Sequence, residues 1–312
     1  MKKYASEIDD FPDLLRVVAR SKKIPAAIVE KDYYLGRALQ AIEFALPGQF
    51  ILKGGTSVSK GWNLLDRFSE DIDLLMRIDS GSGSITKGER ERRLKAACDT
   101  ISATLGFTVV EGKYPVETGV HRTAEFRYRS VADDLPGLSK TTKLEMGTRG
   151  GATAPVTKTI QSLVGEYATH NNLLDLAEDL SPFDTSLQDV RRTFVEKLFA
   201  VHAAYCKDHA ANRTRHYYDV FKLCGLEEVE AYAGTAEYRE SVAEVKALSR
   251  ELFPNQAVPD GDSFSESPAF TPAGEDLAKL ERNYRSEAHL FFVTPPSLRE
   301  ILGDIGRLLP KL

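Results

Sequence analysis

Two aspartates stand two residues apart inside an apolar stretch of the sequence. The apolar residues that alternate with them are Ile72, Leu74 and Met76. A strand here would place the carboxylates of Asp71 and Asp73 on one face, about 6–7 Å apart along the chain. Two like charges held together are costly, and a divalent cation bound through carboxylate oxygens removes that cost. The pair therefore predicts a site for Mg²⁺ or Mn²⁺, and the apolar neighbours disfavour the alternative of a solvated edge strand.

A third carboxylate follows further along the chain. Glu145 lies between Leu144 and Met146 in another alternating stretch, which predicts a neighbouring strand. There it could complete a two-metal site, in which an acceptor hydroxyl attacks the α-phosphorus of a nucleotide while pyrophosphate leaves. In the alternative, Glu145 pairs with Lys143 or Arg127 on the sheet surface, and the residues alone leave both interpretations open.

A glycine pair precedes the aspartates. Gly54-Gly55 follows the apolar run 50–52 and comes directly before Thr56-Ser57. Glycine lets the backbone approach a phosphate closely, and the N–H groups and dipole at a helix N-terminus favour negative charge. Thr56 and Ser57 can cap a helix that carries Val58, Trp62 and Leu65. The pattern predicts a strand, a glycine turn and a helix that bind a nucleotide phosphate, and a plain tight turn is the alternative.

Apolar periodicity predicts the elements that would position these residues. Helices are expected at 25–46, after Ser57, and at 89–105, 187–205, 217–223, 274–288 and 296–309, with strands at 50–52, 71–76, 123–129 and 143–146. The strands cluster before residue 165, and the chain beyond Pro182 is predicted to be helical. Residues 79–88 and 254–272 are rich in glycine, serine or proline, which predicts loops.

The composition is that of an ordinary globular protein. A length of 312 residues suggests two domains, and 42% hydrophobic with 28% charged residues argues against extensive disorder. No apolar run approaches the roughly 18 residues that a membrane span needs, and the N-terminus lacks the apolar stretch of a signal peptide. We therefore expect a cytoplasmic protein that does not bind membranes. The widely spaced Cys98, Cys206 and Cys224 are expected to be small buried side chains rather than metal ligands.

The sequence resembles the AbiEii/AbiGii family of nucleotidyltransferase toxins in two successive motifs, at residues 52–57 and 67–74. These are abortive-infection toxins of type IV toxin–antitoxin systems and are related to the MenT-type toxins. The likeness extends to 29–33 upstream and to 192–198 and 215–219 downstream. It implies an α+β fold, with a polymerase-β-type nucleotidyltransferase lobe of mixed sheet and flanking helices at 1–180. An α-helical C-terminal lobe would occupy 181–312.

The resemblance also implies the site residues. Lys197 and Asp219, on successive helices, would reach into the cleft and act with the aspartates. Lys197 would neutralise triphosphate oxygens as charge shifts to pyrophosphate, while Asp219 could hold Lys197 or an arginine, or contact the nucleotide. The implied catalytic set is Asp71, Asp73, Glu145, Lys197 and Asp219, with the first three as metal ligands. The nucleotide-binding set is Gly54, Gly55, Thr56, Ser57, Lys60, Ser69 and Lys197.

Two smaller expectations concern single residues. A phosphoryl group on Ser69 would add negative charge beside the metal carboxylates, so Ser69 is a candidate inhibitory site, with a turn-capping serine as the alternative. His216 is assigned no role. His202, on a helical face, is expected to be a partly buried side chain with its hydrogen bonds satisfied.

The activity implied by the resemblance is transfer of NMP from an NTP to an acceptor hydroxyl. A tRNA 3′ end would be the acceptor, its modification would block translation and growth, and a DNA-binding antitoxin would be the partner. Seven Lys or Arg against three acidic residues in 191–222 would bind RNA phosphates, although a solvated helix face explains them equally well. Transfer to a protein or to a small molecule such as an antibiotic, and a non-catalytic nucleotide-binding module, are the alternatives.

Overall fold

The computed structural model describes residues 3–78, 85–110, 116–148, 150, 154–207, 213–261 and 263–312. The chain forms two compact units. The first comprises Met1–Asn63, Phe68–Gly150 and Pro155–Leu187, and the second comprises Leu64–Arg67, Gly151–Ala154 and Gln188–Leu312. Most of the loop expected at 79–88, and residues 208–212 of the basic segment, lie outside the described residues.

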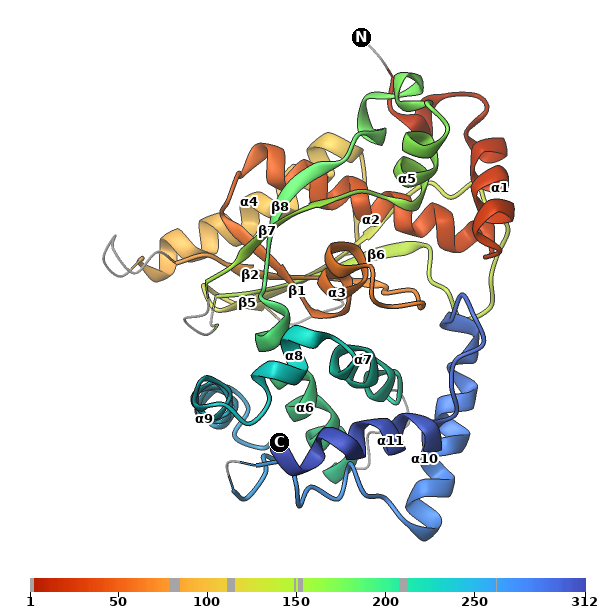
Figure 1. Cartoon of the computed structure of the whole chain (residues 1–312). Coiled ribbons are helices and arrows are strands. Elements are labelled where there is room, and N and C mark those ends of the chain that lie inside the picture. Colours follow the sequence, from red (N-terminus) through yellow and green to blue (C-terminus); the bar gives the residue numbers. More distant parts are fainter. Residues whose placement is uncertain are drawn as a thin grey trace. The chain divides into compact units, whose positions relative to one another are not determined.

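The first unit contains a mixed eight-stranded sheet in the order β3-β5-β6-β2-β1-β8-β7, with β4 beside β5 (Figure 1). Its strands are β1 Phe50–Lys53, β2 Asp71–Met76, β3 Thr108–Val109, β4 Val116–Glu117, β5 His121–Arg127, β6 Thr141–Gly147, β7 Val156–Ile160 and β8 Phe183–Leu187. Strand β2 runs antiparallel to β1 and parallel to β6. Two strands from distant parts of the sequence therefore flank the aspartates.

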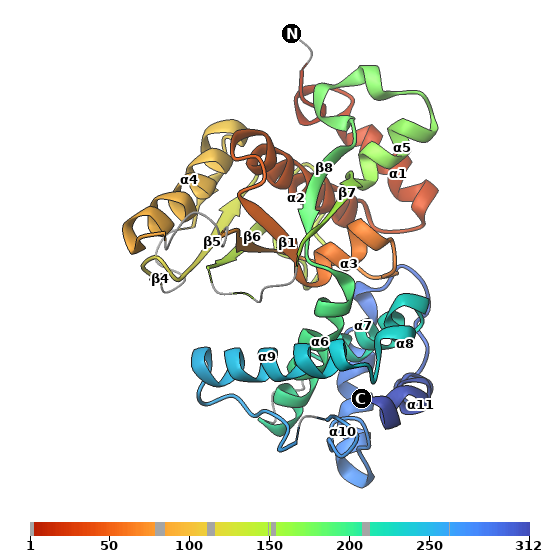
Figure 2. The same ribbon diagram turned by 60° about the vertical axis from the view of Figure 1, so that its left-hand side comes forward.

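The helices of this unit are α1 Phe11–Lys22, α2 Ala26–Ala45, α3 Gly54–Trp62, α4 Lys87–Leu105 and α5 Leu163–His170. Helices α2 and α4 pack on each other, and both contact the sheet (Figure 1 and Figure 2). Helix α4 begins where the Thr86 side chain accepts a hydrogen bond from the Glu89 N–H (3.2 Å) and ends at Gly106, whose φ is +64°. The apolar side chains of β2, including Ile72 and Leu74, are buried in the core.

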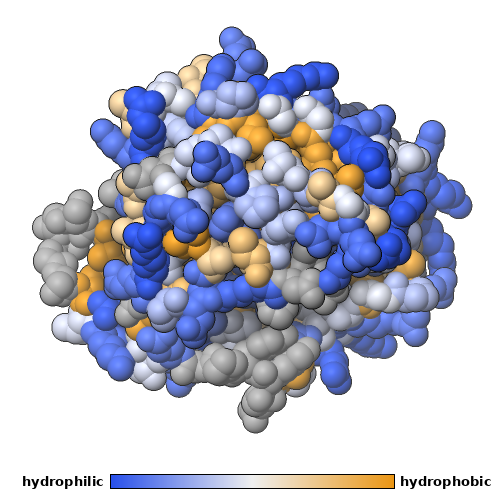
Figure 3. Space-filling model, turned by 90° about the horizontal axis from the view of Figure 1, so that it is seen from below, coloured by the Kyte–Doolittle hydropathy of each residue, from blue (hydrophilic) through white to orange (hydrophobic). Residues whose placement is uncertain are grey.

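The second unit is helical in its described part. Its helices are α6 Val190–Cys206, α7 Arg215–Cys224, α8 Glu227–Tyr232, α9 Ala236–Leu252, α10 Gly274–Ser286 and α11 Leu298–Leu308. Helix α6 packs against α7, α8 and α9, and α7 packs against α11 (Figure 2). The face of the molecule in Figure 3 is mostly hydrophilic, with hydrophobic residues in small separate groups. Such a surface is ordinary for a globular protein.

The fold class expected from the sequence is confirmed, since a mixed sheet with flanking helices is joined to helices in the C-terminal part. One prediction was wrong in the interval after Pro182. Residues 183–187 form strand β8, which pairs with β7 and β1, and are not the start of a helix. The physical reason is a period of two: Phe183, Thr185 and Leu187 are buried, and Asp184 between them is exposed.

Three smaller predictions are also corrected. Helix α3 starts at Gly54, so Thr56 and Ser57 lie inside its first turn and do not precede it as caps. It ends at Trp62, before Leu65. Of the three cysteines, Cys98 is buried as expected, but Cys206 is exposed at the end of α6.

Candidate active site

Strands β2 and β6 bring the three predicted carboxylates to one face of the sheet. In their parallel register, Asp73 pairs with Glu145 and Asp71 pairs with Lys143. These four residues are partly exposed, whereas Ile72 and the other residues between them are buried. Partners across adjacent strands are about 5 Å apart and point to the same side. The two aspartates and the glutamate therefore share one surface.

The state of Glu145 decides how a metal could be held there. Its carboxylate forms an ion pair with the ammonium group of Lys143, as one alternative from the sequence had it. Within the described parts of the chain, no three His, Cys, Asp or Glu side chains are grouped as metal ligands. Mg²⁺ commonly takes only one or two protein carboxylates together with phosphate oxygens. Asp71 and Asp73 fit that mode, while Glu145 would join as a third ligand only if its carboxylate gave up the ion pair with Lys143.

The glycine turn lies directly beside these carboxylates. In the antiparallel register of β1 and β2, Lys53 pairs with Asp73, so the next residue, Gly54, lies at the strand end closest to it. Gly54 has a φ of +68°, and a Cβ atom there would lie only 2.1 Å from Asp73 Oδ2. Both the backbone conformation and the approach of the carboxylate thus require glycine. Because α3 starts at this residue, its first N–H groups have no acceptors within the helix.

The two hydroxyls of this turn are used inside the protein. Thr56 Oγ1 donates to the Asp71 carbonyl oxygen (2.5 Å) and lies 3.1 Å from Ser69 Oγ. Ser57 Oγ donates to the Gly54 carbonyl oxygen (2.9 Å). Both side chains are buried. The hydroxyl of Thr56 therefore fixes the start of β2 to α3, and a phosphate would meet the backbone N–H groups of this turn.

The predicted nucleotide-binding residue Lys60 also has internal partners. Its Nζ lies 2.6 Å from Asp32 Oδ1 and 3.3 Å from the Gln161 carbonyl oxygen. Only 8% of its side chain is exposed. Lys60 therefore links α3 to α2, and its charge is already balanced by Asp32.

Lys197 and Asp219 lie together in the second unit, in a cluster of buried charges. Asp219 on α7 is fully buried and accepts two hydrogen bonds from the Arg67 guanidinium, both 2.7 Å long. Lys197 Nζ on α6 lies 2.9 Å from the same carboxylate. Burial alone would raise the pKa of Asp219, but the charges of Arg67 and Lys197 outweigh burial and hold this pKa well below its usual value. Asp219 is therefore ionised and holds two cations in place.

His216 completes this cluster, although the sequence gave it no role. Its Nδ1 lies 3.2 Å from Lys197 Nζ and 3.3 Å from Asp219 Oδ2. Burial, with the nearby charge of Lys197, lowers the pKa of His216 to about 3. One signal was available, because His216 and Asp219 are three residues apart and thus share a face of α7. Arg67 stands four residues before Asp71 in the sequence, and its role as a partner of Asp219 was not predicted specifically.

The resemblance expected from the motifs is borne out by comparison with protein families. The family model described as the nucleotidyl transferase AbiEii toxin of type IV toxin–antitoxin systems matches residues 37–303. The chain belongs to this family. The fold is similar to that of MenT4, a nucleotidyltransferase toxin from Mycobacterium tuberculosis, with a TM-score of 0.64 and 15% sequence identity. That likeness covers 96% of this chain and 90% of MenT4. No curated protein sequence matches the chain.

Membership of the AbiEii family fixes the general activity. The chain is a nucleotidyltransferase and the toxin of a type IV toxin–antitoxin system, so its substrate is an NTP and an antitoxin is its partner. Nucleotidyltransferases generally use a divalent metal. The family and the enzyme class predicted from the sequence are thus confirmed, and the mixed α/β fold is similar to that of MenT4. No described helix is long and apolar enough to cross a membrane.

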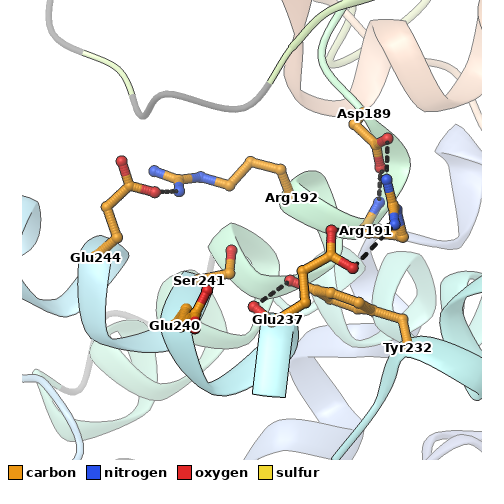
Figure 4. A pocket seen from close by; sticks show the side chains of 8 residues that line it. All are labelled: Asp189, Arg191, Arg192, Tyr232, Glu237, Glu240, Ser241 and Glu244. Carbon is orange, nitrogen blue, oxygen red and sulfur yellow. Dashed lines mark hydrogen bonds and ion pairs between the residues drawn. The ribbon is translucent and has the colours of Figure 1, made fainter. Parts of the chain in front are cut away.

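A pocket of about 350 Å³ in the second unit of this AbiEii protein is lined by two arginines of the basic segment 191–222 and by several acidic residues. In Figure 4, Arg191 extends toward Asp189 and Glu237, and Arg192 extends toward Glu244. Arg192 is buried, with 3% of its side chain exposed. Both guanidinium charges are balanced by carboxylates, two of which lie on α9.

Two lysines of the basic segment also have carboxylate partners. Lys197 pairs with Asp219, and Lys222 Nζ lies 3.0 Å from Asp66. Most of these partners lie outside 191–222, and four of the seven positive charges counted along this segment are paired with carboxylates in the fold. Arg192 and Lys197 are also too buried to belong to a solvated helix face.

Proposed function

We propose that this toxin transfers NMP from an NTP to the 3′-terminal hydroxyl of tRNA in a Mg²⁺-dependent reaction, and so blocks translation and growth. The observation that carries the proposal is the position of Asp71 and Asp73 on one sheet face, with Gly54 in contact with Asp73. A carboxylate pair beside the N–H groups of a helix start is suited to a metal-bound triphosphate. The cytoplasm is the compartment that holds NTP, tRNA and an antitoxin together.

In this reaction, the N–H groups at Gly54 and Gly55 would bind phosphate oxygens, and the carboxylates of Asp71 and Asp73 would hold the cation. A Mg²⁺ (or Mn²⁺) ion held there would lower the pKa of the attacking hydroxyl and would offset charge on the phosphates. The acceptor hydroxyl loses its proton to solvent and its oxygen forms a bond to the α-phosphorus. The bond from the α-phosphorus to the oxygen that bridges to the β-phosphate breaks, and pyrophosphate leaves with that oxygen. The hydrogen bond from Thr56 to the Asp71 carbonyl keeps the carboxylates at a fixed place beside the turn.

Lys197 and Asp219 enter the proposal through the family motifs. We assign to Lys197 the neutralisation of triphosphate oxygens as negative charge grows on the leaving pyrophosphate. Asp219 is a positioning residue, since its buried carboxylate is already taken by Arg67 and Lys197. Lys60 is left out, because its ammonium group is paired with Asp32, whereas Lys197 shares the carboxylate of Asp219 with Arg67.

Regulation at Ser69 stays a prediction. Its hydroxyl lies 3.1 Å from Thr56 Oγ1, two residues before Asp71. A phosphoryl group there would carry close to two negative charges at neutral pH and would repel both the carboxylates and a nucleotide.

The test is to incubate the purified protein with total RNA, Mg²⁺ and each α-labelled NTP in turn. Label on tRNA supports the proposal, and the labelled NTP identifies the preferred base. Label on a protein or on a small molecule would assign a different acceptor to the same chemistry. Wild-type protein that transfers no label to any acceptor would contradict the proposal.

A pair of variants separates catalysis from binding. Asp71→Ala should lose transfer and should relieve the growth arrest caused by expression without the antitoxin. Asp134→Ala is the matched control, because the Asp134 side chain is 87% exposed and pairs with the surface residue Lys140. Growth arrest that persists in Asp71→Ala would favour a nucleotide-binding module that acts without catalysis.

A further inference from the structure

Helix α2 carries three consecutive charged residues that are all buried. Glu30 and Lys31 are each 1% exposed, and Asp32 is 6% exposed. Buried charges are costly unless they are paired, so each must have a partner that repays its desolvation. The three find partners in three different segments, and two of those segments lead into the proposed active site.

Lys31 reaches the segment that precedes the catalytic strand. Its Nζ lies 3.0 Å from Glu70 Oε2 and 3.1 Å from Ser139 Oγ. Only 2% of the Lys31 side chain is exposed. Glu70 is the residue directly before Asp71, so this ion pair ties the first residue of β2 to α2.

Asp32 reaches the helix that follows the glycine turn. Its Oδ1 lies 2.6 Å from Lys60 Nζ, and its Oδ2 accepts a hydrogen bond from the Leu163 N–H (2.7 Å). Lys60 stands four residues after Thr56 on α3, so both side chains lie on one face of that helix. Thr56 is the residue that holds the Asp71 carbonyl. Two neighbouring residues of α2 therefore hold the two segments that meet at the carboxylates.

We propose that Lys31 and Asp32 are positioning residues, which fix the start of β2 and the glycine-turn helix relative to each other through Glu70 and Lys60. The inference deepens the proposed function and rests on it. The contact between Gly54 and Asp73 is tight, and a displacement of either segment changes it. Misplacement of a catalytic group by about 1 Å can cost about 10²-fold in rate. Glu30 holds a different loop, through Ser130 and the Val131 N–H, and is not part of the proposal.

The test compares two buried cations of α2. Lys31→Met should lower kcat for pyrophosphate release by about 10- to 100-fold, with the KM for NTP changed less than about threefold, because alignment and not binding is lost. Arg37→Met is the control, since Arg37 also forms a buried ion pair, with Asp179 at 2.9 Å, but contacts neither segment. It should destabilise the fold and keep kcat. Lys31→Arg should recover most of the lost kcat.

A second measurement examines the same claim in the metal-free protein. Hydrogen–deuterium exchange of the amides at 69–73 should rise in Lys31→Met and stay unchanged in Arg37→Met. The kcat of the double variant Lys31→Met/Glu70→Gln should be no lower than that of Lys31→Met, because both substitutions break the same ion pair.

The outcomes separate the two proposals. If wild-type protein releases no pyrophosphate, the proposed function fails, and the exchange measurement alone decides the positioning role. If the wild type is active and Lys31→Met has the kcat of Arg37→Met, or exchange at 69–73 does not change, the positioning role is overturned.

Discussion

Gly54→Ala tests the geometry of the proposed active site with a single methyl group. Gly54 has a φ of +68°, where a residue with a side chain costs about 1–2 kcal/mol. The added Cβ would also lie 2.1 Å from Asp73 Oδ2, whereas ordinary contacts begin at 3.4 Å. The carboxylate of Asp73 must therefore move by more than about 1 Å, a displacement that typically costs about 10²-fold in rate.

Gly48→Ala is a matched control for the backbone strain. Gly48 has a φ of +66°, and nothing lies within 4 Å of the Cβ that it would gain. Both variants should lose about 1–2 kcal/mol of the free energy of unfolding, measured by urea denaturation. Only Gly54→Ala should lose kcat in an assay of pyrophosphate release. Equal activity of the two variants would refute the reasoning, because it would mean that the contact with Asp73 has no part in catalysis.

Three further predictions concern individual side chains. His216 has a pKa of about 3 in the folded protein, against 6.5 in the unfolded chain. Between these two pH values the unfolded chain therefore binds one more proton than the folded protein. Stability consequently falls as the pH drops through that window. His216→Asn should flatten the urea-denaturation slope between about pH 4 and 6 by up to about 1.4 kcal/mol per pH unit; an unchanged slope would mean that His216 is protonated in the fold. Asp219→Asn should cost about 3–5 kcal/mol of stability, measured by the same method, because it leaves two buried cations without a carboxylate. A loss below about 1 kcal/mol would contradict the claim that Asp219 stabilises these cations. Lys143→Met should tighten Mn²⁺ binding, measured by titration, if Glu145 is a third ligand; unchanged affinity would leave Glu145 out of the metal site.

Much of the fold was predictable because its residues alternate regularly. Strand β2 was expected at 71–76 and is found there, since an apolar residue follows each aspartate. Strand β8 was missed because its five residues include three polar side chains and stand next to a helix start, where polar residues are also common. The edge strand β7, Val-Thr-Lys-Thr-Ile, was missed for a related reason. Only one of its faces is covered, so its three central residues are polar and the stretch lacks a clear apolar signal.

The site was predictable where it depends on local spacing. Two carboxylates two apart on a strand must share a face, so Asp71 and Asp73 could be paired from the sequence alone. The pairing of Asp73 with Glu145 needs the register of two strands that are far apart in the chain. Whether Glu145 binds Lys143 or a cation is a competition between charges, which spacing alone does not decide.

The sequence left open whether Asp219 holds Lys197 or an arginine, and the structure has it hold both. The charge state of this cluster could not be predicted, because it depends on burial. Of its four side chains, Arg67 and Lys197 carry positive charges, Asp219 carries a negative charge and His216 is neutral, which leaves a net charge of +1. A protonated imidazole 3.2 Å from Lys197 Nζ would place a further positive charge beside the ammonium group, and burial and Lys197 both lower the pKa of His216. A neutral His216 therefore leaves these four side chains with one more positive than negative charge across the physiological range. That excess is what a lysine needs if it is to attract the oxygens of a triphosphate while its ammonium group stays fixed by Asp219.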